Sequence, residues 1–209
     1  MGAVAQLPHL TELYLASNKL RDMEGLAGLS KLKKLDLGAN RLRDVVGGVA
    51  ELTQLKELWL GKNKIEKIEG VETLVHLQRL DVQSNRLTSI DGIAACVELE
   101  ELYLAHNAIE EIGSGLETLA ALNTLDLSQN RLLSLKGVEK CTSLEELWVS
   151  DNKMEAFEAA TEPCAALKSL DTIYLERNPL AAEYEYRIRL AKDLPSISQL
   201  DATPVRRPG

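Results

Sequence analysis

The feature that most constrains this chain is one spacing of apolar residues and asparagine, L-x-x-L-x-L-x-x-N-x-L, which occurs eight times. Its copies start at Leu10, Leu32, Leu55, Leu77, Leu99, Leu122, Leu144 and Leu170. Successive asparagines of the motif are 22, 23, 22, 22, 23, 22 and 26 residues apart. A chain with such a fixed period folds as a stack of like units, because one unit cannot bury its own apolar face.

This consensus and period are those of the leucine-rich repeat. The short segment Leu58-Trp59-Leu60 alternates with period two, so its leucines should point into the stack and the residue between them onto the inner wall. The asparagine follows where the chain turns, and its amide can bond backbone groups that the turn leaves unpaired. The sequence therefore predicts an α/β solenoid: a leucine-rich-repeat horseshoe of eight repeats with a parallel β concave face.

The outer crossings carry apolar residues at every third position, such as Ile65, Ile68 and Val71, which favours 3₁₀-like turns or short helices on the convex face. A glycine recurs before the middle apolar residue and predicts a positive φ or a close backbone approach. These glycines are Gly25, Gly48, Gly70, Gly92, Gly115 and Gly137. The last gap leaves room for a true helix within residues 156–170.

The two ends of the chain differ. The segment "EYEYRIRLAKDL", followed by Pro195, predicts a helix that covers the last repeat. We therefore expect eight leucine-rich repeats in residues 1–180 and a C-terminal helical cap in residues 181–209. The first strand begins almost at once, so we expect its core layer to be covered by further repeats or by a partner.

The three cysteines, Cys96, Cys141 and Cys164, fall in columns that other repeats fill with leucine or valine. We interpret them as buried apolar residues rather than metal ligands, disulfides or nucleophiles. An odd count without paired spacing fits a reducing, intracellular compartment. The sequence has no apolar run long enough for a membrane span and no signal-peptide pattern, and Gln6 departs from the myristoylation motif.

No catalytic constellation is visible around the three histidines, and there is no phosphate-binding loop or metal-spaced cluster. We therefore expect a protein that is not an enzyme and that uses no cofactor, no metal and no small-molecule substrate.

Two columns of residues should face the concave side. The residue between the strand leucines reads Tyr14, Asp36, Trp59, Asp81, Tyr103, Asp126, Trp148 and Tyr174, which includes five of the chain's eight aromatic residues. The column two residues earlier begins Glu12, Lys34, Glu57 and Arg79. One interpretation of both columns is a set of cross-strand pairs that stabilise the sheet. The other is a binding surface, because aligned aromatics on an open wall typically anchor a partner; we favour it for the aromatic column.

The charge of this wall indicates the kind of partner. The wall is acidic and the chain carries a net charge of −8, which argues against nucleic acid and favours a protein with a basic patch. Eight parallel strands span roughly 34 Å, which suits a folded protein. The position after each asparagine is usually basic, as in Lys19 and Arg41, and we interpret that row as a solvated rim.

Longer segments resemble the leucine-rich-repeat regulatory subunits of protein phosphatase 1, the regulatory subunit 7 family. "LDVQSNRLTSIDGI" and "ELYLAHNAIEEI" are similar to its later repeats, and "YLERNPL" followed by "LPSISQLDATPVR" resembles its C-terminal cap. The family has several more repeats before this point. The resemblance implies a non-catalytic regulator, found in nucleus and cytoplasm, that binds the protein phosphatase 1 catalytic subunit on its acidic, aromatic concave face. The partner-binding residues it implies are Tyr14, Asp36, Trp59, Asp126, Glu146, Trp148 and Tyr174.

The match at these positions is one of character rather than identity. Tyr14 and Trp59 stand where the family commonly has another aromatic residue, and Asp36 stands where it has glutamate. The alternative is a structural leucine-rich-repeat module of a cytoskeletal assembly, like the axonemal dynein light chain, or of a spliceosomal one. The cap segment "LDATPVR" favours the phosphatase family.

Overall fold

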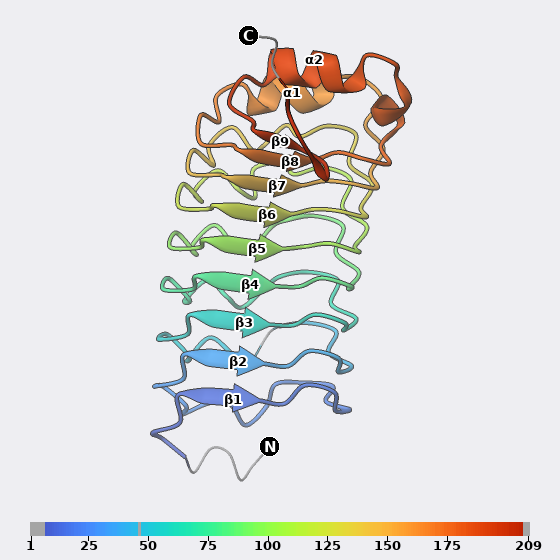
Figure 1. The fold of residues 1–209 in the computed structure, drawn as a ribbon. Coiled ribbons are helices and arrows are strands. Elements are labelled where there is room, and N and C mark those ends of the chain that lie inside the picture. The colour runs from blue at the N-terminus through green and yellow to red at the C-terminus, as the bar shows by residue number, and fades with distance from the viewer. Residues whose placement is uncertain (1–6, 46, 207–209) are drawn as a thin grey trace.

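The chain forms a solenoid in which every repeat adds one short strand to a single sheet (Figure 1). The computed structural model describes residues 7–45 and 47–206. Strands β1 to β9 run parallel in sequence order, and β10 is antiparallel to β9. Their bounds are β1 Glu12–Tyr14, β2 Lys34–Asp36, β3 Glu57–Trp59, β4 Arg79–Asp81, β5 Glu101–Tyr103, β6 Thr124–Asp126, β7 Glu146–Trp148, β8 Thr172–Tyr174, β9 Gln199–Leu200 and β10 Thr203–Pro204. The predicted leucine-rich-repeat solenoid with its parallel sheet is confirmed.

The core is one continuous apolar column behind this sheet. The middle residue of each strand points inward, and Leu58, for example, is fully buried and pairs in register with Leu35 and Leu80. Its two strand neighbours, Glu57 and Trp59, lie on the other side and are partly exposed. Each repeat therefore places two side chains on the wall for every leucine that it buries there.

The motif asparagines join neighbouring repeats, as their position predicts. Asn63 donates from Nδ2 to the carbonyl oxygens of Leu60 in its own repeat (2.9 Å) and of Leu37 in the preceding one (3.0 Å). Its Oδ1 accepts the backbone N–H of Leu42 at 3.0 Å. Asn85 and Asn107 make the same bonds one and two repeats further on. The side chains thus satisfy backbone groups that the turn after each strand leaves without a ladder partner.

The outer crossings are successive tight turns. Leu74 N–H donates to the oxygen of Val71 (3.0 Å) and Leu77 N–H to that of Leu74 (3.1 Å), which is the i to i−3 pattern expected from the spacing of three. The glycines sit where predicted: Gly92 has φ +97, and a Cβ there would lie 1.7 Å from the oxygen of Ile68. Neighbouring crossings therefore approach more closely than any side chain would permit.

The C-terminal end is closed by helices, as expected from its sequence (Figure 1). Helix α1 (Glu158–Cys164) fills the long last gap, and the 3₁₀ helix η2 (Pro179–Ala182) leads toward helix α2 (Tyr186–Asp193). Arg189 of α2 pairs with Glu158 of α1 and lies over the Phe157 ring, 4.5 Å from its centroid. One feature was not predicted: after α2 the chain returns to the sheet as β9, where Leu200 pairs with Ile173 of β8. The expected boundary between repeats and cap, at residues 180 and 181, stays a prediction.

The three cysteines are part of the core. Cys96, Cys141 and Cys164 are buried free thiols in the core, as predicted.

In the first repeat Leu13 is only partly buried and Leu7 is 51% exposed, while residues 1–6 and any cover that they provide lie outside the described residues. Among the helices described, none has the length and apolar character needed to cross a membrane.

Candidate protein-binding face

The register of the sheet aligns the predicted wall column. Asp36 lies directly beside Tyr14 on one side and Trp59 on the other, and Asp126 lies beside Tyr103 and Trp148. Alternating aromatic and acidic side chains are therefore true neighbours across adjacent strands. They differ in exposure, because Tyr14 is 60% exposed whereas the other aromatics of the column are partly buried.

The second column contains the charge pairs that the cross-strand interpretation expects. Lys34 Nζ lies 3.0 Å from Glu57 Oε1, and Arg79 lies 2.6 Å from Glu101. Tyr103 also donates its hydroxyl to Glu101 at 2.6 Å. Burial and this bond raise the pKa of Tyr103 to about 12. Burial acts to raise the Glu101 pKa as well, but the bonds from Tyr103 and Arg79 outweigh it and lower that pKa.

The aspartates of the first column have a structural bond that the sequence analysis missed. Asp36 Oδ1 accepts the backbone N–H of Gly38 at 2.9 Å, and Asp126 Oδ1 accepts that of Ser128 at 2.9 Å. Burial raises the pKa of Asp126, and it also raises that of Asp81. The signal was present, since aspartate readily bonds an N–H two residues on. The aspartates of this column therefore fix the backbone just after their strands and also give the wall its negative charge.

The wall is not flat but has two hollows. The first, about 330 Å³, is lined by Tyr14, Asp36 and Trp59, and also by Gly38, Gly61, Lys62 and Asp81. The second, about 450 Å³, is lined by Asp126, Trp148 and Tyr174, and also by His106, Ser128 and Ser150. Gln83 lies between them and lines both. Six of the seven predicted partner-binding residues thus line one hollow or the other. The seventh, Glu146, is exposed in the neighbouring column.

Trp148 is held by its neighbours in the second hollow. Its ring meets that of Tyr174 edge to face, with centroids 6.2 Å apart and planes at 77°. The Tyr174 hydroxyl in turn accepts a bond from Gln199 Nε2 at 2.9 Å, so the cap strand β9 helps to position the wall. The indole Nε1 of Trp148 and Oε1 of Gln129 are buried and have no hydrogen-bond partner among the described residues. Such unpaired polar atoms are rare in buried positions.

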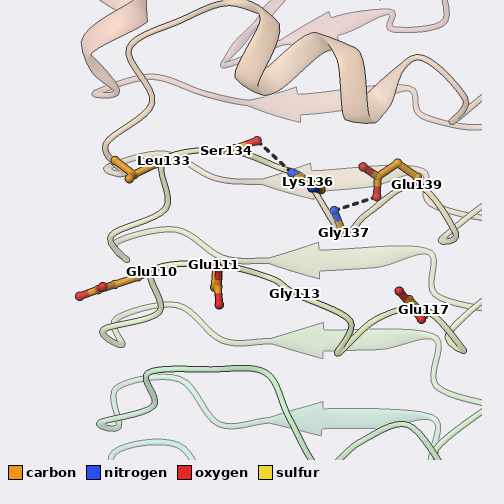
Figure 2. Close-up of a pocket in the computed structure, with 9 residues that line it drawn as sticks. All are labelled: Glu110, Glu111, Gly113, Glu117, Leu133, Ser134, Lys136, Gly137 and Glu139. Carbon is orange, nitrogen blue, oxygen red and sulfur yellow. Dashed lines mark hydrogen bonds between the residues drawn. The ribbon is translucent and has the colours of Figure 1, made fainter.

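A third hollow, of about 510 Å³, lies elsewhere, between the segments that follow β5 and β6 (Figure 2). It holds several glutamates, but they are engaged separately: Glu139 accepts the N–H of Gly137 at 2.7 Å, and Glu110 lies 3.6 Å from Arg131. In Figure 2 the glutamate side chains do not converge on one point. Within residues 7–45 and 47–206, no three histidine, cysteine, aspartate or glutamate side chains are grouped to hold a metal ion.

Comparisons with known proteins agree with this architecture. A family model described as "Leucine-rich repeat" matches residues 80–208, and another, "Leucine Rich repeats (2 copies)", matches residues 8–51 and 53–95. The chain belongs to the leucine-rich-repeat family. Members of this family are generally non-catalytic scaffolds that mediate protein–protein interaction, and a protein-binding scaffold is what this chain's open, aromatic wall fits.

Solved structures similar to this chain include proteins of Leptospira interrogans and Listeria monocytogenes. A leucine-rich-repeat protein of Leptospira interrogans is 28% identical with a TM-score of 0.83, covering 95% of this chain and 50% of that one. Internalin C2 of Listeria monocytogenes is 26% identical with a TM-score of 0.81, covering 95% of this chain and 83% of that one. The chain thus spans about half the length of the Leptospira protein. Among curated proteins there is no significant match.

Proposed function

We propose that this chain is a non-catalytic regulator that binds the protein phosphatase 1 catalytic subunit through its concave face. The observation that carries the proposal is the alignment of aromatic and acidic side chains on one open wall, of which Asp36, Trp59, Asp126 and Trp148 form the centre. Aromatic residues dominate the binding energy of protein interfaces, and acidic neighbours favour a basic partner surface. The choice of phosphatase rests on the sequence resemblance of the later repeats and of the cap segment 194–206.

The decisive measurement is calorimetric titration of the folded chain with the purified catalytic subunit. If Trp148 is an anchor, Trp148→Ala should weaken binding by about 2 kcal/mol or more, roughly thirty-fold. The double variant with Trp59→Ala should bind more weakly still. Tyr184→Ala is the matched control, because Tyr184 is 97% exposed and precedes α2, outside the wall.

Each result has a defined meaning. Binding that the tryptophan variants lose and the Tyr184 variant keeps would support both the wall and the partner. A folded wild-type chain that does not bind the catalytic subunit would refute the phosphatase assignment. Binding that survives both tryptophan substitutions would move the site off the wall.

The proposal includes a location, nucleus and cytoplasm, where such a regulator would meet the phosphatase. The buried free thiols Cys96, Cys141 and Cys164 are compatible with a reducing compartment. Imaging of a fluorescent fusion together with the phosphatase tests this directly, and its exclusion from both compartments would contradict the proposal.

A further inference from the structure

The two hollows of the wall share one layout. In the first, Asp36 on β2 lies beside Trp59 on β3; in the second, Asp126 on β6 lies beside Trp148 on β7. In each case the aspartate precedes the tryptophan by one strand, in the same column. The chain has two tryptophans, and each hollow holds one of them.

Small residues keep both hollows open. Gly38 and Gly61 line the first, and Ser128 and Ser150 line the second at the corresponding motif positions. A Cβ added at Gly61 would lie 3.3 Å from Asp81 Oδ1, and one at Gly38 would lie 3.2 Å from Asp36 Oδ1. A larger side chain in this column would therefore crowd the aspartate and fill the space above it.

Gln83 lies between the two hollows and lines both. Gln83 covers its own aspartate, with its backbone N–H on Asp81 Oδ1 at 2.9 Å and its Nε2 on Asp81 Oδ2 at 2.9 Å. Both oxygens of Asp81 are thus occupied within the chain. Of the two aspartates that line the first hollow, Asp36 and Asp81, Asp36 is therefore the one whose second oxygen has no bond within the described residues.

The chemistry of each position suits a guanidinium group. An indole face attracts a planar cation, and a neighbouring carboxylate can accept its N–H groups in the same plane. Asp36 has Oδ1 on the backbone of Gly38 and leaves Oδ2 for a ligand. Asp126 is desolvated and accepts the backbone N–H of Ser128, and among its neighbours His106 acts to lower its pKa, so an arginine beside it would compensate a charge that the fold compensates only in part. Arg177, which also borders the second hollow, is already paired with Asp151 at 3.0 Å.

We propose that the two hollows are paired subsites for two arginine side chains of one protein partner. Four strand steps of about 4.8 Å separate them, so the arginines should be about 19 Å apart. The inference rests on the proposed function only in taking the concave face as the binding surface; it specifies what a partner must present there. Lysine fits less well, because an ammonium group does not stack as a plane on an indole face.

Short synthetic peptides test this without any phosphatase. The matched probe is acetyl-Arg-Pro₅-Arg-amide, in which the polyproline spacer rises about 3.1 Å per residue and sets the arginines about 19 Å apart. Acetyl-Arg-Pro₂-Arg-amide, with about 9 Å, is the mismatched control. The readout is the NMR signal of each indole N–H, since Trp59 and Trp148 report the two hollows separately.

The expected result is that the matched peptide shifts both indole signals and binds at least about tenfold more tightly than the short peptide, because its second contact is intramolecular. Its lysine analogue should bind several-fold more weakly. Asp36→Asn should remove the response of Trp59 alone, and Asp126→Asn that of Trp148 alone, each reducing affinity to that of one site. Asp91→Asn, an exposed acid outside the wall, is the charge control.

Three results would overturn the inference: equal affinity for the two spacers, equal affinity for lysine, or a Trp59 shift that survives Asp36→Asn. Failure here is separable from failure of the proposed function. The catalytic subunit could bind the wall without using these subsites, and the peptides could bind a wall that does not recognise the phosphatase.

Discussion

Replacing Asn152 by leucine tests whether the asparagine ladder, and not apolar packing alone, holds the repeats together. Asn152 is 2% exposed. Its Oδ1 accepts the N–H of Leu132 at 2.9 Å, and its Nδ2 donates to the oxygens of Leu127, Val149 and Ser150. Leucine has the same number of side-chain heavy atoms, branched at the same carbon, and can make none of these bonds.

The expected loss of stability depends on which backbone groups lose their only hydrogen-bond partner. The oxygens of Leu127 and Val149 keep a second donor, because Asn130 and Asn178 also bond them. The N–H of Leu132 has no second acceptor, and leaving a buried N–H without a hydrogen bond costs roughly 1–3 kcal/mol of folding free energy. Three further lost bonds at roughly 0.5–1 kcal/mol each bring the expected total to about 4 kcal/mol.

The assay is urea unfolding followed by both circular dichroism and tryptophan fluorescence, so that loss of cooperativity between repeats would be visible. Asn18→Leu is the matched control, since Asn18 holds the same motif position but is exposed. Water can replace its bonds to Leu15 and Ala16, so its loss should stay below about 1 kcal/mol. Equal losses in the two variants, or a loss below about 1 kcal/mol at Asn152, would refute the reasoning.

Three further predictions follow from burial and backbone geometry. Asp126→Asn keeps an acceptor for the Ser128 N–H and removes a carboxylate whose pKa burial has raised, so in urea titrations at neutral pH the variant should be at least as stable as the wild type. Because the pKa of Asp126 is higher in the folded chain than in the unfolded one, protonation stabilises the wild type, and the difference in unfolding free energy should shrink as the pH falls toward 3.8. A variant less stable than the wild type at pH 7 would contradict this. Gly92→Ala forces a Cβ against a backbone oxygen at positive φ and should cost about 3 kcal/mol or more, whereas Gly28→Ala, at φ +90 with nothing within 4 Å, should cost about 1 kcal/mol in the same assay. Burial raises the pKa of Cys164 to about 12, so iodoacetamide at pH 8 should modify it many times more slowly in the folded chain than in urea, as followed by mass spectrometry, and equal rates would contradict its burial.

Repetition is why so much of this fold was predictable. Eight copies of one spacing place Leu58 inside and Trp59 on the wall by the same period-two argument, and the structure confirms both positions. The ladder role of Asn63 also followed from chemistry alone, because leucine could fill its space but could not bond. The alignment of the aromatic and acidic column followed from the period, since strands in register bring equal motif positions side by side.

The details of the wall were not predictable in the same way. Gln83 lies between the two hollows and occupies both oxygens of Asp81 with its own N–H groups. The position of Trp148 depends on Tyr174, whose hydroxyl is held by Gln199 from the cap. These contacts join residues at different positions of the motif. A repeating pattern predicts only what all repeats share, so it does not predict contacts that occur in one repeat alone.

The sequence by itself determined the solenoid, its parallel sheet, the buried leucines and asparagines, and the acidic aromatic character of one face. Those properties are local, because each repeat needs only its own alternation and a like neighbour on either side. Only the tertiary structure decided which wall side chains are free. It ties the aspartates to backbone N–H groups, brings β9 back into the sheet beside Ile173, and leaves two tryptophan hollows open on either side of Gln83. The physical reason is that side-chain bonds and packing on an open surface depend on neighbours in space. The repeat specifies which residues are neighbours but not the rotamers that their side chains adopt.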